Sequence, residues 1–113
     1  MSEPLTRKDW APELRAFTHR NAGRRTVLEV DAAEFGAQEE ESDYPFWGAS
    51  YDPRDQRIQI MLGEQGSVDR HLTHSIEGAS EVGFLSDDAG RDRALRIVHE
   101  GGQTLLRFVE IGS

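Results

Sequence analysis

The chain has 113 residues and a mass of 12.7 kDa, which is the usual size of one compact domain. It contains 13 Lys and Arg residues and 21 Asp and Glu residues, which gives a net charge of −8. Nucleic-acid-binding domains are usually basic, so this balance argues against that class. The chain contains no cysteine, which excludes disulfide frameworks, thiolate metal sites and thiol nucleophiles. We predict a single acidic domain over residues 1–113.

One amphipathic helix is predicted near the front of the chain. Three large apolar residues recur there at positions i, i+4 and i+7, which form one face of a helix. They are Trp10, Leu14 and Phe17. Asp9 is the predicted N-cap, because Pro12 then lies in the first turn, where its missing N–H is unpaired in any case. Asn21-Ala22-Gly23 supplies the stop, so we place the helix at about residues 9–21 with its apolar face buried.

The rest of the chain, about residues 24–110, has the period-two alternation of antiparallel strands. Short apolar runs are separated by turn sequences, and Gly101-Gly102 fits a two-residue type I′ hairpin. Residues 32–43 fit a short acidic helix or a bulged strand, and the sequence leaves both open. We predict an α+β fold in which one N-terminal amphipathic helix packs on a curved antiparallel sheet or half-barrel of six or seven short strands.

An aromatic stretch follows an acidic run in the middle of the chain. Four aromatic residues occur between Tyr44 and Tyr51, and on a regular strand Trp47 and Tyr51 share one face. If that face is exposed, it suits a flat ligand or a segment of a partner. The alternative is that a small β-rich domain uses these aromatics to fill its core. The predicted contact residues are Tyr44, Trp47 and Tyr51.

Two of the four histidines are three residues apart, as in some metal sites. On a strand, however, His71 and His74 point to opposite faces and cannot chelate one ion. His74 is in phase with Leu72 and Ile76, which indicates a half-buried structural histidine. We therefore predict no metal and no cofactor, with His71 and His74 as the weak metal candidates. The alternative is a metal-binding protein or enzyme that uses His71, His74 or His99.

Other catalytic patterns are missing or are better explained as turns. The stretch from Gly48 to Asp52 fails the G-x-S-x-G pattern at its last position, and no phosphate-binding glycine motif is present. Asp87-Asp88 precedes Ala89-Gly90 and is typical of a turn. The acidic run from Glu39 to Asp43 is typical of a solvated segment. None of these patterns therefore supports an enzymatic activity.

The charges are unevenly distributed along the chain. Residues 1–28 carry 6 basic and 3 acidic groups, whereas residues 29–113 carry 7 basic and 18 acidic groups. A nucleic-acid site would use the basic groups near the predicted helix, with Trp10 stacking on a base. These groups are Arg7, Lys8, Arg15, Arg20, Arg24 and Arg25. The net charge of the chain makes nucleic acid an unlikely partner.

Six segments spread along the chain carry a resemblance to a known family. They are Trp10, Gly36-Ala37-Gln38, the strand end from Gly48 to Asp52, the run from Arg57-Ile58 to Leu62, His71-Leu72-Thr73-His74 and Thr104-Leu105-Leu106-Arg107-Phe108. Together they resemble a family of small prokaryotic domains of unknown function. The resemblance implies no activity, cofactor or catalytic residue.

We predict a non-enzymatic binding or interaction domain. Its partner is a protein or a small ligand, and we expect a homo-oligomer, of which a homodimer is the simplest form. The basic N-terminal residues are not followed by an apolar run, and no apolar run reaches the roughly 18 residues of a membrane span. We therefore expect a cytoplasmic protein that does not use a membrane. A further alternative is an acidic inhibitor or immunity-type protein, whose binding would weaken with salt.

Overall fold

A computed structural model describes residues 4–32, 36–63 and 71–109. A short 3-10 helix, η1 (Arg7–Asp9), leads into α1 (Trp10–Asn21). The seven strands of the described residues follow in chain order. They are β1 (Arg25–Ala32), β2 (Gly36–Asp52), β3 (Arg57–Gly63), β4 (His71–Glu77), β5 (Ala79–Ser86), β6 (Asp92–His99) and β7 (Gly102–Phe108).

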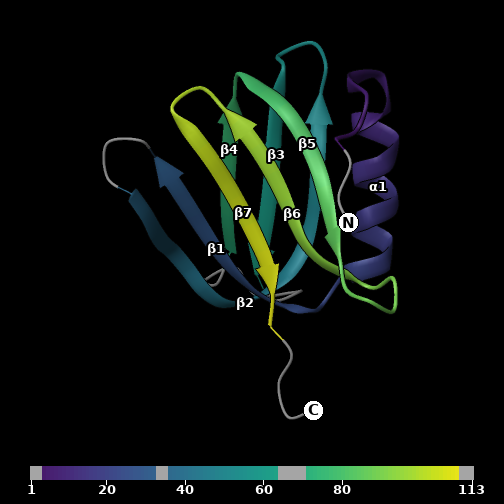
Figure 1. Cartoon of the computed structure of the whole chain (residues 1–113), viewed down its shortest axis with the longest axis vertical. Coiled ribbons are helices and arrows are strands. Elements are labelled where there is room, and N and C mark those ends of the chain that lie inside the picture. Colours follow the sequence, from purple (N-terminus) through teal and green to yellow (C-terminus); the bar gives the residue numbers. More distant parts are fainter. Residues whose placement is uncertain (1–3, 33–35, 64–70, 110–113) are drawn as a thin grey trace.

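The strands form one antiparallel sheet in the order β4-β3-β2-β1-β7-β6-β5. The first half of β2 pairs with β1 and its second half pairs with β3. Because this long strand serves two neighbours, the sheet bends along it. Figure 1 shows β5, β6 and β7 in front of β3 and β4, with α1 along one side. The predicted α+β class is confirmed, and the sheet is not closed into a barrel.

The core lies between the bent halves of the sheet and α1. Trp10, Leu14 and Phe17 are buried, as the helical stripe predicts. Phe17 stacks on Phe84 of β5 at 4.6 Å between ring centroids and meets Phe46 of β2 edge-on at 5.6 Å. The helix therefore joins the two halves of the sheet through aromatic packing.

Helix α1 takes the place of a strand where β1 turns away from β2. Thr18 Oγ1 accepts a hydrogen bond from the Ala49 amide at 3.0 Å. Its hydroxyl proton is shared between the carbonyls of Ala49, at 3.1 Å, and Leu14, at 2.8 Å. The bend in β2 leaves these Ala49 groups without a neighbouring strand, and one threonine satisfies both. Gly48 leaves room for this contact, because a Cβ there would lie 3.2 Å from Thr18 Cγ2.

The structure decides three local predictions: the N-cap of α1, the turn between β6 and β7, and the form of residues 36–43. Asp9 is the N-cap of α1, but its side chain makes no capping hydrogen bond, because η1 already holds the preceding turn. The prediction of a type I′ turn at Gly101-Gly102 is wrong. His99 pairs with Gly102, so Glu100 and Gly101 form the turn, and only Gly101 of these two has a positive φ. Of the two alternatives for residues 32–43, the bulged strand is found over residues 36–43, which belong to β2.

No helix within the described ranges is long and apolar enough to cross a membrane.

Candidate functional site

The structure separates the aromatic residues that the sequence places on one strand face. Phe46 pairs with Leu62 and Gly48 with Met61, so Trp47 is an extra residue in a β-bulge. A bulge reverses the side-chain alternation that follows it. Trp47 is therefore exposed, at 45 %, whereas Tyr51 turns toward the interior. The two rings do not form a shared outward platform.

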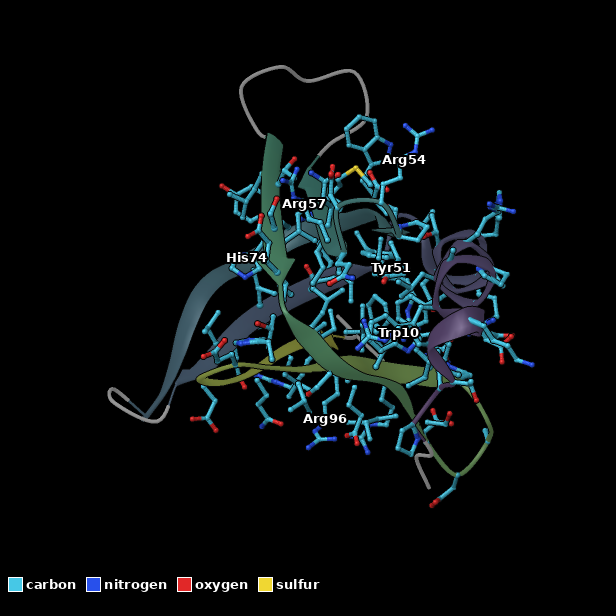
Figure 2. All side chains as sticks on the ribbon, turned by 90° about the horizontal axis from the view of Figure 1, so that it is seen from above. Trp10, Tyr51, Arg54, Arg57, His74 and Arg96 are labelled. Atoms are coloured by element: carbon cyan, nitrogen blue, oxygen red, sulfur yellow. The ribbon has the colours of Figure 1, made fainter. Side chains whose placement is uncertain are left out.

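Tyr51 and Tyr44 are both half-buried and pack against the core. Tyr51 meets the buried Trp10 ring edge-on at 5.1 Å, and Figure 2 shows the two side chains together in the interior. Trp10 is also covered by the Arg7 guanidinium, which lies 4.5 Å from its ring centroid. Trp10 is thus a core residue and cannot stack on a nucleic-acid base.

The histidines do not converge on one centre within the described part of the chain. His74 pairs with Ile60 and is half-buried, as its phase with Leu72 and Ile76 indicates. His99 Nε2 lies 2.9 Å from Thr104 Oγ1, which makes it part of the β6–β7 hairpin. The His71 side chain lies outside the described side chains. No group of three or more metal-ligating side chains occurs among the described residues.

A different cluster gathers where the end of α1 meets the β5–β6 turn and the end of β7. We call it the arginine face. It consists of Arg20, Arg24, Arg91, Arg93 and Arg107, which line two adjoining hollows of about 420 Å³ and about 340 Å³. The described lining of these hollows includes two carboxylates, from Asp87 and Asp92. Positive charge therefore dominates this surface, although the whole chain is acidic.

Asp92 holds the helix end to the sheet. It accepts hydrogen bonds from Arg20 Nε and from Asn21 Nδ2, both at 2.8 Å, while its main-chain carbonyl accepts one from Arg24 at 2.8 Å. Burial raises the pKa of Asp92, but the hydrogen bonds from Arg20 and Asn21 and the positive charges of Arg20 and Arg24 together outweigh burial, so the pKa lies below its ordinary value. The hydrogen bond between Arg20 and Asp92 also raises the pKa of Arg20. This ion pair fixes the position of the arginine face.

The neighbouring arginines are also oriented. Arg24 lies over the Phe108 ring at 4.2 Å, and Arg107 donates to Glu29 Oε1 at 2.7 Å. The Asp87 carboxylate accepts the amides of Ala89 and Arg91, which confirms its expected place in a turn. The amide of Arg91 is the largest of the causes that lower the pKa of Asp87. The guanidinium groups of Arg24 and Arg107 are thus held in place on this surface.

Arg93 differs from the other four arginines. Leu85 pairs with Ala94 and Ser86 with Asp92, so Arg93 is the extra residue of a bulge in β6. It is exposed, and among the described residues it is the one member of the arginine face without a side-chain hydrogen bond or ion pair. It also lines a third hollow, of about 320 Å³, with Leu85, Ala94 and Leu105. Bulges commonly redirect a side chain toward a binding site.

A family model of unknown function, DUF5335, matches residues 1–111. The chain belongs to DUF5335. This agrees with the resemblance seen in the sequence, and the family carries no assigned activity. No curated protein and no solved structure matches this DUF5335 chain.

Sequence reasoning missed three of the five arginines in the arginine face of this DUF5335 domain. Arg20 and Arg24 belong to residues 1–28, which are basic overall. The other three, Arg91, Arg93 and Arg107, come from residues 29–113, which are acidic overall. The available signal was the pair Arg91 and Arg93 directly after the Gly90 turn. Their convergence with the helix end requires the strand order to be known.

Proposed function

We propose that this domain is a non-enzymatic binding module whose arginine face takes an acidic segment of a protein partner. The observation that carries the proposal is the convergence of five arginines on adjoining hollows of an acidic chain. Guanidinium groups bind carboxylates through paired hydrogen bonds, and arginine is enriched in protein interfaces. A concave surface also concentrates the positive potential.

The apolar lining favours a peptide over a simple anion. Phe108 and Val109 line one arginine hollow, and Leu85, Ala94 and Leu105 line the third hollow beside Arg93. A segment that alternates carboxylates with apolar side chains fits both features. A long nucleic acid would extend beyond the five arginines onto a chain whose net charge is −8, where its phosphates would be repelled.

Trp47 is a second candidate contact for the same partner. It is exposed, and it follows Phe46, whose backbone bonds to Gly23 and Arg24 at the end of the helix. The Trp47 ring is therefore presented by a segment of β2 that is bonded to the turn after α1. The same turn carries Arg24. Exposed tryptophans frequently contribute strongly to binding.

Titration with a synthetic Glu-rich peptide that also contains leucines tests the proposal. NMR shifts should change at Arg93 and Val109, and Arg93→Glu should weaken binding about tenfold, which is the effect of ~1.4 kcal/mol. Arg54→Glu is the matched control, because Arg54 is exposed on the β2–β3 turn (Figure 2) and lines neither arginine hollow. Trp47→Ala tests the second contact in the same titration.

Two results would count against this function. Equal binding by the Arg93→Glu and Arg54→Glu variants would show that the arginine face is not the site. Tighter binding of oligothymidylate than of the peptide would assign the face to nucleic acid instead. Inorganic phosphate serves as a comparator for the charge alone.

A further inference from the structure

The two edges of the sheet are protected differently. The edge of β5 is covered by the N-terminal segment, where the Leu5 amide donates to the Val82 carbonyl at 2.7 Å and Pro4 bridges to Gly83. Among the described residues, no backbone hydrogen bond reaches the outer edge of β4. The pairing of β3 with β4 also runs without a register shift, whereas the pairings of β2 and β5 contain bulges. A regular, uncovered edge is a template for another strand.

The contact of Thr18 with Ala49 shows which backbone groups of β4 lie at this edge. Because the Ala49 amide and carbonyl bind Thr18, they point away from β3. Its partner Ile60 therefore directs its own groups toward β4, where it pairs with His74. Backbone direction alternates along a strand. The N–H and C=O groups of Thr73 and Ser75 consequently point to the open edge.

The side-chain alternation of β4 limits how a second copy can pair with it. Residues opposite each other in antiparallel strands lie on the same face of the sheet. Two copies of β4 can obey this rule in several antiparallel registers. The register with the longest overlap places His74 on a two-fold axis. It sets Leu72 opposite Ile76 of the second copy on the core side, and Thr73 opposite Ser75 of the second copy on the solvent side. Thr73 and Ser75 then exchange backbone hydrogen bonds across the axis.

The charge of β4 permits this pairing in an otherwise acidic chain. The strand has one carboxylate, Glu77, which is bound by Arg57 of β3 at 3.3 Å. In the two-fold register, Glu77 stands opposite position 71 of the second copy and not opposite another Glu77. Carboxylates therefore do not meet along the new strand pair.

We propose that β4 is a homodimerisation edge, through which two copies of this chain join their sheets across a two-fold axis at His74. The interface is isologous, because each copy offers the same strand. The interface uses neither the arginine face nor Trp47, so the dimer can be tested independently of the proposed function.

Sedimentation equilibrium of the full chain tests the dimer, with Ser75→Pro and Ser75→Ala as a matched pair. Proline removes the Ser75 amide, which faces the open edge, without removing a bond to β3. Both variants lose the serine hydroxyl, which lies 3.5 Å from Gln59 Nε2. We expect dimers of the natural chain and of Ser75→Ala, but a monomer for Ser75→Pro. A monomeric natural chain at millimolar concentration would overturn the proposal, as would a folded, dimeric Ser75→Pro variant.

Disulfide trapping gives a second test that does not depend on proline. The chain has no cysteine, so a single introduced thiol can cross-link only to a second copy. On the axis, Cα atoms of a non-hydrogen-bonded pair are about 4.5 Å apart, within the range of a disulfide. His74→Cys should therefore cross-link under mild oxidation. In Thr73→Cys the two thiols sit at diagonal positions about 7–8 Å apart, beyond easy bridging. Equal cross-linking of both variants would contradict the register.

Discussion

Asp92 joins three parts of the molecule through one residue. Its carboxylate accepts hydrogen bonds from Arg20 and Asn21 at the end of α1, and its carbonyl accepts one from Arg24 in the following turn. The Asp92 side chain is 10 % exposed, whereas that of Arg20 is 46 % exposed. The acidic partner is thus sheltered while the arginine reaches the surface. Asp92 therefore positions the guanidinium groups of Arg20 and Arg24.

Asp92→Asn should destabilise the fold by about 1–2 kcal/mol, because charged hydrogen bonds become neutral ones. The pKa of Asp92 is lowered in the folded state, so its contribution is present above the unfolded pKa of about 4 and is lost as pH falls through the folded pKa. Urea unfolding should therefore show a constant difference between the natural chain and the variant above about pH 5, which shrinks in acid. An equal urea midpoint at pH 7 would contradict this role.

At the scale of elements, α1 acts as a substitute for a neighbouring strand. The bend of β2 leaves part of its edge open, and Thr18 satisfies both backbone groups of Ala49 there. Ala49 is buried, so water does not readily replace this partner. One polar side chain on an otherwise apolar helix face therefore sets how the helix lies against the sheet.

Thr18→Val tests this substitution at nearly constant volume. It leaves the buried Ala49 amide and carbonyl without the hydroxyl, at a cost of about 1–3 kcal/mol. Thr18→Ser keeps the hydroxyl and should lose much less stability. Chemical denaturation of the three proteins gives the comparison. Equal loss in both variants would mean that the methyl group, and not the hydrogen bonding, makes the contact.

At the scale of the whole molecule, the N-terminal segment protects one edge of the sheet. Leu5 bonds to Val82, the Arg7 guanidinium donates to the Ala79 carbonyl at 3.1 Å, and the Trp10 indole N–H donates to the Leu5 carbonyl at 3.2 Å. These contacts cover the beginning of β5 and also seal the core beside Trp10. Residues 4–9 thus belong to the fold as much as the helix does.

Deletion of residues 1–9 should uncover the β5 edge and make the domain aggregate. Light scattering during a thermal ramp should show larger particles and a lower melting temperature than for the natural chain. A deletion of residues 1–3 is the control, because it keeps Pro4, Leu5 and Arg7. Aggregation of the shorter deletion to the same degree would mean that the Leu5 and Arg7 contacts do not protect this edge.

Much of the fold could be predicted because its signals are local. The spacing of Trp10, Leu14 and Phe17 defines a helix face, and period-two alternation defines strands. The wrong hairpin type at Gly101-Gly102 arose because one residue of register moves the turn, and sequence does not fix that register. The aromatic platform failed for a related reason, since the bulge at Trp47 reverses the face of Tyr51.

The candidate site depended almost wholly on pairings distant in sequence. Composition and alternation alone determined an acidic chain without cysteine and an α+β fold. Tertiary structure decided that Arg91, Arg93 and Arg107 join Arg20 and Arg24, and that β4 is an edge strand of the sheet formed by the described residues. The physical reason is that strand order and bulges are set by contacts across the whole sheet. A local pattern records the face of a residue but not its distant neighbours.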